Sequence, residues 1–316
     1  MRRRAWGVLL ILALIFLATC ARRPAGPVAT ETRLPPTPPR TATPVPTETP
    51  SPTCTSVPTP TETPTEESEE ADTVRFTIVY DNNAHDPSLR TDWGFACLVH
   101  RGNTTVLFDT GANGHILLSN FTALELDPNS IDAVVLSHAH GDHTGGLSAV
   151  LGASDRATVY VPASFSQRFK DGVAEQTELV EVAEAVEVGD GFVSTGEVGS
   201  GIVEQALAVE TAAGWVVLTG CAHPGIVSMV RQAKDAVDGE IALVMGGFHL
   251  GRADPPKIDG IIDAFEDMGV ERVAPCHCTG DRARGRFKDA FGDDCLLAGV
   301  GQVIEIDSNG EMTVLE

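Results

Sequence analysis

One stretch of the chain limits its fold more than any other: residues 137–146, which read Ser-His-Ala-His-Gly-Asp-His-Thr-Gly-Gly. The apolar residues 131–136 come directly before it and predict a buried strand, and residues 147–151 predict a helix after it. Four side chains that can bind metals therefore lie at a turn from strand to helix: His138, His140, Asp142 and His143. A mixed imidazole and carboxylate set of this kind suits a hydrolytic metal site with open coordination positions.

The spacing of these four side chains predicts two metal positions rather than one. His138 and His140 are two residues apart on an extended backbone, so both point to the same side and can share one ion. Asp142 and His143 follow where the chain turns, so they face a second position nearby. The expected cofactors are two divalent ions, zinc first, with manganese or iron as the alternatives.

The charge of the chain limits its partners. It has 44 acidic and 22 basic residues, which gives a formal net charge of −22. Because proteins bind nucleic acid phosphates through Lys and Arg, this balance argues against nucleic acid or an anionic membrane surface as a partner. It fits a soluble, exported protein that acts on a small-molecule substrate. The sequence does not indicate an oligomeric state.

The first residues of the chain resemble a bacterial lipoprotein signal. The chain begins Met-Arg-Arg-Arg, residues 5–18 are apolar but too short to span a bilayer comfortably, and Leu17-Ala18-Thr19-Cys20 is similar to a lipobox. Residues 1–19 would then be a signal peptide, and a lipid on Cys20 would anchor the mature protein to a bacterial membrane, outside the cytoplasm. An uncleaved N-terminal anchor is the alternative, and it keeps the protein on the same side of the membrane.

Residues 20–72 are interpreted as a linker between this anchor and one folded domain. Thirteen of the 20 prolines lie between Pro24 and Pro64, in repeated Thr-Pro and Pro-Thr units with almost no apolar residues. Since such a composition cannot form a core, we expect a disordered or polyproline-like linker. Residues 73–316 then form a single domain.

The pattern in residues 73–316 predicts two β-rich halves, each followed by helices. In the first half we expect strands at 74–80, 95–99, 105–108, 131–136, 157–161 and 179–188, a turn at 101–103, a helix at 147–151 and a short helix or loop at 164–172. In the second half we expect strands at 203–209, 215–219, 241–245, 270–274, 302–306 and 312–315, and helices at 225–237, 257–268 and 287–291. This alternation is typical of an α/β fold.

Three further histidines each follow an apolar strand. They are His223 in Gly-Cys-Ala-His-Pro-Gly, His249 in Gly-Gly-Phe-His-Leu, and His277 in Pro-Cys-His-Cys-Thr-Gly. This repeated placement favours their convergence at one edge of the fold. Cys276 and Cys278 flank His277 on a predicted strand, point away from it, and are interpreted as small buried thiols.

The pattern His-x-His-x-Asp-His-Thr-Gly-Gly at residues 138–146 resembles the signature of the metallo-β-lactamase superfamily. The resemblance implies a four-layer αβ/βα sandwich with metals at the sheet edges. This chain departs from many members in two ways. It has no histidine between His143 and His223, and Cys221 stands where those members have a metal-bridging aspartate. Both departures resemble the dihydropterin-synthase-like metallo-hydrolases, a subgroup related to an enzyme of methanopterin biosynthesis.

The resemblance to this subgroup covers residues 74–301 and includes the motifs at 80–82, 93–94, 108–111, 219–223, 246–250 and 277–280. It implies two ligand sets, His138, His140 and His223 for the first ion, and Asp142, His143 and His277 for the second. Cys221 either bridges the ions as a thiolate, which would favour zinc, or merely lines the site. His249 is either an extra ligand or substrate contact, or a packed histidine at a strand end.

Two groups beyond the ligands complete the predicted site. Asp109, in the strand-end sequence Asp-Thr-Gly, either orients a ligand histidine by a hydrogen bond or is a plain turn or cap residue. Thr279 precedes the first turn of a helix that carries Arg282 and Arg284, so these three residues are a hypothetical anion site for a phosphoester. A solvated basic helix face is the alternative.

These observations predict an extracytoplasmic metal-dependent hydrolase that acts on an ester or phosphoester. Two ions would lower the pKa of a bridging water, and Asp142 could act as a general base. Two alternatives stay open: a zinc- or ligand-binding lipoprotein without catalysis, and a pterin-related transferase, as the subgroup's name suggests. The complete ligand set favours an enzyme, and export argues against the transferase because pterin precursors are cytoplasmic.

Overall fold

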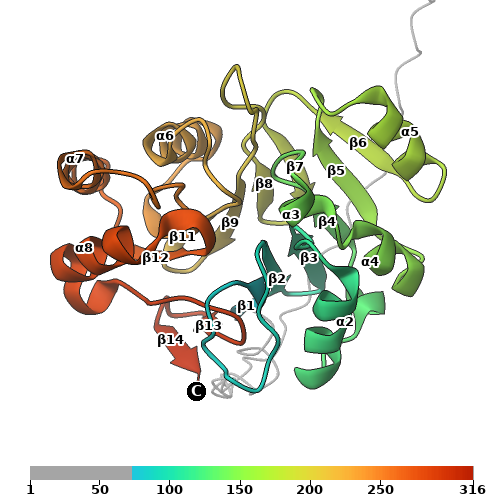
Figure 1. Ribbon diagram of the computed structural model, residues 1–316, viewed down its shortest axis with the longest axis horizontal. Coiled ribbons are helices and arrows are strands. Elements are labelled where there is room, and N and C mark those ends of the chain that lie inside the picture. Colours follow the sequence, from blue (N-terminus) through green and yellow to red (C-terminus); the bar gives the residue numbers. More distant parts are fainter. Residues whose placement is uncertain (1–72, 316) are drawn as a thin grey trace, which may run out of the picture. The chain divides into compact units, whose positions relative to one another are not determined.

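The computed structural model describes residues 73–315 of the chain (Figure 1). The predicted signal peptide (residues 1–19) and the predicted linker with its lipidated Cys20 (residues 20–72) lie outside the described residues and stay predictions. Among the helices of residues 73–315, none is both long and apolar enough to cross a membrane.

The first sheet combines strands from the beginning, the middle and the end of the described region. Its eight strands have the order β14-β13-β1-β2-β3-β4-β5-β6. They are β1 (Val74–Asp81), β2 (Phe95–Arg101), β3 (Thr104–Phe108), β4 (Ala133–Val135), β5 (Thr158–Pro162), β6 (Leu179–Val182), β13 (Val303–Ile306) and β14 (Met312–Leu315). Strands β3 to β6 are parallel to one another, and the other neighbours pair antiparallel. The predicted turn at 101–103 joins β2 to β3, with Gly102 at φ 56°.

The second sheet has six strands in the order β12-β11-β10-β9-β8-β7. They are β7 (Val186–Gly189), β8 (Phe192–Ser194), β9 (Leu207–Thr211), β10 (Gly214–Thr219), β11 (Ile241–Gly247) and β12 (Arg272–Cys276). Strands β10, β11 and β12 are parallel, while β7 to β10 form an antiparallel meander. Each sheet therefore contains one parallel half, and only parallel strands place their carboxyl ends at one common edge.

Helices cover the outer face of each sheet. Those on the first sheet are α2 (Gly114–Ala123), α4 (Leu147–Ala153) and α5 (Gln167–Ala174), and those on the second are α6 (Ile226–Ala236), α7 (Pro255–Asp267) and α8 (Asp281–Phe291). Figure 1 shows the first group on the right, the second on the left, and both sheets between them. The one-turn helix α3 (Gly141–Thr144) follows β4 near the centre of the view.

Three separate hydrophobic cores hold these layers together. Alternation along β3 shows how one strand serves two of them, because Val106 and Phe108 pack between the sheets, whereas Leu107 packs under the helices of the first sheet. In the second sheet Val217 faces α6 to α8 while Val216 faces the other sheet. Three cores require four layers, so the predicted αβ/βα sandwich is confirmed.

The structure corrects several predicted elements. Residues 179–188 do not form one edge strand: the chain leaves the first sheet after β6 and enters the second at β7. The strand predicted at 203–209 begins only at Leu207, because residues 204–206 form a buried loop. Helix α2 and strand β8 were not predicted, and the helical turn predicted after Gly280 and the helix predicted at 287–291 are one continuous helix, α8.

Candidate metal centre

Side chains from both sheets meet beyond the carboxyl ends of the parallel strands. Asp109 follows β3, His138 and His140 follow β4, and Asp142 and His143 lie on α3. From the second sheet, Cys221 and His223 follow β10, His249 follows β11, and His277 follows β12. The structure thus brings all six predicted ligands to one place, as the interpretation requires, although their coordination of an ion stays a prediction.

The backbone at this edge is unusually strained. Asp109, Ala222, His249 and His277 have φ angles of 57°, 58°, 54° and 44°, in the left-handed region that residues with side chains rarely adopt. Among residues 73–315, Glu125 is the one other non-glycine residue with positive φ. Such conformations cluster at functional sites, where the surrounding structure holds them in place. All four strained residues lie directly at or beside predicted site residues.

The first predicted ion position is a triangle of imidazole nitrogens. His138 Nε2 lies 3.0 Å from His140 Nδ1, and His223 Nε2 lies 3.2 Å from the same atom. A tetrahedral ion at about 2.0 Å from each nitrogen holds them roughly 3.3 Å apart. Burial lowers the pKa of His138 well below its usual range, and burial together with His249 and His140 lowers that of His223 to about 4. Both rings are therefore neutral near pH 7, as metal binding requires.

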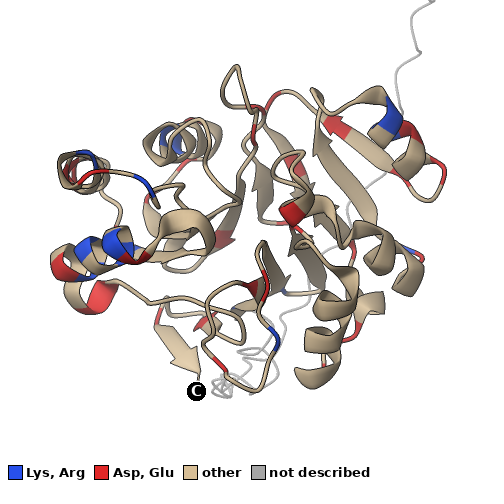
Figure 2. Ribbon diagram, in the orientation of Figure 1, with Lys and Arg blue, Asp and Glu red and all other residues tan. Residues whose placement is uncertain are grey.

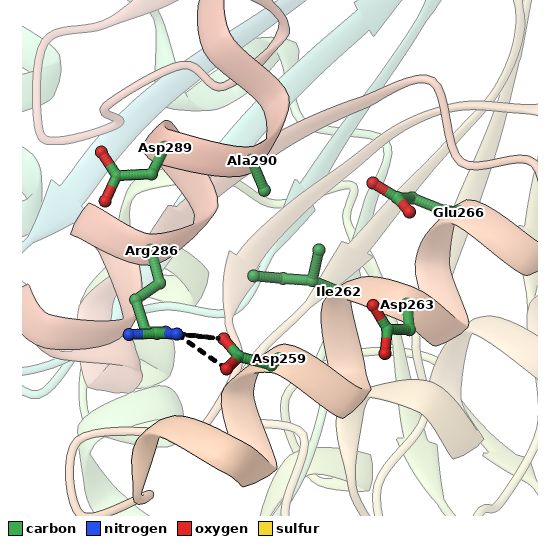
Figure 3. Close-up of a pocket in the computed structure, with 7 residues that line it drawn as sticks. All are labelled: Asp259, Ile262, Asp263, Glu266, Arg286, Asp289 and Ala290. Carbon is green, nitrogen blue, oxygen red and sulfur yellow. Dashed lines mark hydrogen bonds and ion pairs between the residues drawn. The ribbon is translucent and has the colours of Figure 1, made fainter.

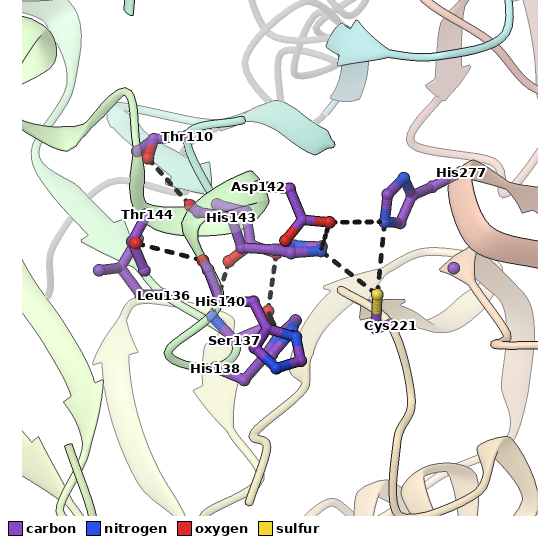
Figure 4. A network of polar contacts seen from close by, with 12 residues as sticks. Thr110, Leu136, Ser137, His138, His140, Asp142, His143, Thr144, Cys221 and His277 are labelled. Atoms are coloured by element: carbon purple, nitrogen blue, oxygen red, sulfur yellow. Dashed lines mark hydrogen bonds and ion pairs between the residues drawn. The ribbon is translucent and has the colours of Figure 1, made fainter. Parts of the chain in front are cut away.

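The second predicted position is a set of four donor atoms. Asp142 Oδ2 lies 3.6 Å from His143 Nε2 and 3.6 Å from His277 Nε2. The sulfur of Cys221 lies 3.3 Å from each of these two nitrogens (Figure 4). Burial would raise the pKa of Asp142, but the hydrogen bond with His277 and the charge of His143 lower it well below its usual range. Asp142 is therefore an anionic donor near pH 7.

Cys221 lies between the two positions. Its sulfur contacts the imidazoles of the second set and also lies within 4.8 Å of ligand atoms of His138 and His223 in the first. The sequence left open whether this thiol bridges two ions or only lines the site. Cys221 is buried and its sulfur lies close to both donor sets, which fits the bridging interpretation.

Asp109 contacts a predicted ligand from behind. Its Oδ2 accepts a hydrogen bond from Ser137 Oγ at 2.7 Å and lies 2.6 Å from His143 Nδ1, and its Oδ1 accepts one from the Ser137 amide. Asp109 is fully buried. A carboxylate at Nδ1 fixes the ring tautomer and turns the Nε2 lone pair toward an ion. Of the two predicted roles for Asp109, this geometry favours orientation of the ligand over a plain turn.

Glu204 is a site residue that the sequence interpretation missed. It is fully buried in the loop before β9, where its Oε2 accepts a hydrogen bond from the Ala222 amide at 2.6 Å. Its Oε1 lies 3.4 Å from His138 Nδ1 and 3.9 Å from His223 Nε2 and has no hydrogen-bond partner. Burial raises the pKa of Glu204 to about 8. Glu204 thus lies beside His138 of the first position, as Asp109 lies beside His143 of the second.

Cys278 is also closer to the centre than the sequence suggested. Residues His277–Thr279 form a 3-10 turn (η2) instead of a strand, so Cys278 does not point away from the site. The interaction between the two sulfurs raises the pKa of Cys221 and lowers that of Cys278. His249 is exposed, and its ring centroid lies 4.2 Å from that of His223.

The residues of the predicted anion site differ in exposure and in their partners. Thr279 is buried, donates to the Cys276 carbonyl at 2.7 Å and accepts from the Phe248 amide. The guanidinium of Arg284 donates to Asn83 Oδ1 at 2.6 Å and to the Ala298 carbonyl at 2.9 Å. Thr279 and the two terminal nitrogens of Arg284 therefore bind internal groups, whereas the buried Arg284 Nε has no hydrogen-bond partner. An anion-binding role for these residues stays a prediction. Arg282 is exposed.

The charged groups on α8 do not form a second site. Figure 2 shows several Lys and Arg residues on this helix. One of them, Arg286, lines a pocket between α7 and α8 and donates two hydrogen bonds of 2.7 Å to Asp259 (Figure 3). The pocket is lined by Asp259, Ile262, Asp263, Glu266, Arg286, Asp289 and Ala290. The pairing with Asp259 neutralises the guanidinium, and four carboxylates in the lining disfavour an anion.

One exposed aromatic residue lies beside the centre. The side chain of Trp93 is 54% exposed, and its ring centroid lies 4.9 Å from that of His277. Large apolar side chains with such exposure are few among the described residues. The indole therefore offers a flat apolar surface next to the second position.

Donor atoms that could hold metal ions thus gather at one edge of an αβ/βα sandwich, and the family model of the metallo-β-lactamase superfamily matches residues 94–281. The chain belongs to that superfamily. A relative from Methanocaldococcus jannaschii, named 7,8-dihydropterin-6-methyl-4-(β-D-ribofuranosyl)-aminobenzene-5'-phosphate synthase, is 28% identical over 63% of this chain and 84% of its own length. The predicted resemblance to this subgroup is confirmed.

Solved structures agree with this family. The chain is similar to Tm1679, described as a metal-dependent hydrolase of the β-lactamase superfamily, with 28% identity, a TM-score of 0.61, and coverage of 77% of this chain and 99% of that one. The metallo-β-lactamase fold protein YhfI from Bacillus subtilis shows the same fold, with 18% identity and a TM-score of 0.58 over 74% of this chain and 99% of that one.

Proposed function

We propose that this protein is a hydrolase that uses two divalent ions, zinc first, to cleave an ester or phosphoester. One observation carries the proposal: two complete donor sets from opposite sheets converge with the Cys221 sulfur between them. Donor atoms separated by 3.0 to 3.6 Å fit ions of this size without rearrangement. A partly buried cluster of imidazoles, a carboxylate and a thiol does not stabilise a hydrophobic core, because polar groups are costly to bury.

When bound, the two ions would supply an activated water nucleophile and positive charge near the attacked centre. The chain's own residues prepare that chemistry. Asp109 fixes the tautomer of His143, and Asn82 Oδ1, 2.9 Å from His277 Nδ1, does the same for His277. Asp142, ionised and partly exposed, is the acceptor best placed to hold a proton at the solvent side of the second position.

The direction of substrate approach follows from exposure. His138, His143 and Cys221 are buried, whereas His140, His249 and Trp93 are exposed. A substrate therefore reaches the centre past these three rings. Because Thr279 and two nitrogens of Arg284 bind internal groups, the proposal is not restricted to a strongly anionic substrate.

A second candidate is group transfer on a pterin-like compound. It is favoured by the 28% identity with the Methanocaldococcus jannaschii synthase together with the exposed indole of Trp93 beside His277. A flat heterocycle can stack on such a surface. In this case Trp93→Ala should weaken turnover of substrates with a fused ring and leave simple esters unaffected.

The deciding experiment is metal analysis of the full chain, followed by a panel of carboxylic esters, lactones, phosphomonoesters and phosphodiesters. Activity that depends on two ions and disappears in His138→Ala supports the proposal. Two bound ions with no turnover on any substrate would favour the zinc- or ligand-binding protein without catalysis. Turnover that survives His138→Ala would overturn the role of the first position.

We also propose that the protein acts outside the cytoplasm, anchored through a lipid on Cys20. The support is the lipobox-like sequence 17–20 and the Thr/Pro-rich residues that follow it. Expression of the full chain in a bacterium should place it in the membrane fraction, and Cys20→Ala should shift it away from there. Accumulation of both forms in the cytoplasm would contradict this localisation.

A further inference from the structure

A third group of donor atoms adjoins the two-ion centre at Cys221. It consists of the Cys221 sulfur, the Cys278 sulfur and a ring nitrogen of His249, which all lie within 4.8 Å of one another. Neither ligand set of the proposed two-ion centre uses Cys278 or His249. The three residues come from separate elements: the end of β10, the turn η2 and the end of β11.

The backbone around this group keeps the donors together. A Cβ atom at Gly247 would lie 2.8 Å from the Cys278 sulfur and would collide with the Gly220 carbonyl oxygen, so only glycine leaves room for the thiol. Cys278 also donates to the Cys221 carbonyl at 3.6 Å. At β11, the left-handed conformation of His249 directs the chain out of the strand immediately after the buried Phe248.

The donor chemistry of the group is softer than that of its neighbours. Two thiols and one imidazole suit thiophilic cations such as zinc, and tetrahedral ions hold such donors roughly 3.3 to 3.8 Å apart. The upper limit of 4.8 Å permits this spacing after small side-chain rotations. Both thiols are buried while His249 is exposed, so a cation can enter from solvent on the histidine side.

We propose that Cys221, Cys278 and His249 form a third cation site for a thiophilic divalent ion, adjoining the two-ion centre and sharing the Cys221 sulfur with it. The site has three protein donors, which leaves a fourth tetrahedral position for water or a small ligand. The proposal rests on the proposed function in that Cys221 also belongs to the second ion position. It goes beyond that function, because a hydrolase with two ions needs neither Cys278 nor His249.

Titration of the reduced full chain with cobalt(II) chloride tests this site without reference to activity. The third site contributes two sulfur–cobalt bonds in the wild type, and Cys221 contributes one more to the two-ion centre, or two if it bridges both ions. Cys278→Ser should therefore bind one cobalt ion fewer and lose at least about half of the thiolate-to-cobalt charge-transfer absorption. Cys97→Ala, which removes a buried thiol in β2 outside the centre, is the matched control and should leave both quantities unchanged.

His249→Ala provides a second route, because its exposed side chain can be removed without disturbing the core. It should weaken the third cobalt ion by at least about tenfold while far-ultraviolet circular dichroism stays the same. Wild-type stoichiometry and absorption in both variants would overturn the proposal, as would a Cys221–Cys278 disulfide in the metal-loaded protein.

The same titration separates this proposal from the proposed function. If the two-ion centre is wrong, His138→Ala and His277→Ala will bind as many ions as the wild type, while Cys278→Ser still loses one. If only the third site is wrong, His138→Ala and His277→Ala will each bind fewer ions than the wild type, while Cys278→Ser binds as many as the wild type.

Discussion

The two ion positions of the proposed centre differ in donor charge and in burial. The first is built from three imidazoles, two of which, His140 and His223, are exposed or partly exposed. The second combines an ionised carboxylate and a thiol with His143 and His277, both buried. Anionic donors in a buried set bind divalent ions more strongly than neutral donors near solvent. We therefore expect the second position to retain its ion more firmly, and the first to exchange it.

The largest effects should come from removal of one ligand at a time. His277→Ala should release the second ion, and His223→Ala only the first. Each variant should lose activity by at least about a hundredfold, because even residues that only hydrogen-bond to metal ligands can contribute that much. Metal content and turnover measured on the same samples check this. Loss of both ions in both variants would mean that the positions are one cooperative site.

The carboxylates of Asp109 and Glu204, which lie beside ligand histidines, allow a finer comparison of the two ion positions. Asp109→Asn should weaken the second ion by about 10- to 100-fold, and Glu204→Gln should weaken the first by a similar factor. Competition with a chelator, followed by cadmium NMR, resolves the two positions because only the second has a carboxylate donor, Asp142. An equal weakening of both ions in either variant would contradict the separate roles given to these carboxylates.

Acidification should separate the positions by roughly one pH unit. Burial lowers the pKa values of His138 and His223 in the first set, whereas in the second set burial is outweighed by the hydrogen bond with Asp142 and by nearby charges, which raise the pKa of His277. Because protons compete with metals for donors of higher pKa, the second ion should leave at a higher pH than the first, in a titration followed by cobalt absorption. Simultaneous release would show that the donor sets do not differ in the way the pKa values imply.

The metal-free protein allows a test of Glu204 by stability alone. Its pKa of about 8 in the folded state lies above the ordinary 4.5, so the folded chain holds an extra proton between these pH values. The contribution of this group to the unfolding free energy is therefore lost as pH rises through that window, by at most about 1.4 kcal/mol per pH unit. Glu204→Gln should gain stability relative to the wild type from pH 5 to 8, measured by urea unfolding. A constant difference would mean that Glu204 titrates normally.

The smallest effect is expected outside both positions. The exposed Arg282 donates a single long hydrogen bond of 3.4 Å to the Ala253 carbonyl. Arg282→Ala should change activity on esters and phosphoesters by less than about twofold. A loss of tenfold or more on phosphoesters alone would restore an anion-binding role for this residue.

Much of the site could be predicted because its ligands follow a simple rule of position. Each predicted ligand comes directly after an apolar strand or in the turn that leaves it, and parallel strands end at a common edge. The missed residues obey no such rule. Glu204 acts from a loop that read as part of a strand, and Cys278 faces the centre because η2 replaces the expected extended backbone.

The strands of the fold also differ in how well the sequence predicts them. Strands with clear alternation or long apolar runs, such as β1, β10 and β11, were predicted almost to the residue. The crossing between sheets at residues 183–185 was not, because the polar alternation at 179–188 does not reveal which sheet a strand joins. The hydrogen bonds of Arg284 and Thr279 could not be predicted for a related reason: their partners, Asn83 and Phe248, are distant in sequence.

The proposed centre lies where residues of the two sheets meet. His143 reaches it from the first sheet, and Cys221 and His277 reach it from the second. A cation bound there would connect the two sheets. Because an ion that binds only the folded chain stabilises it, the free energy of unfolding should rise with the concentration of free metal. The heat resistance of this protein should therefore track the metal supply of its surroundings.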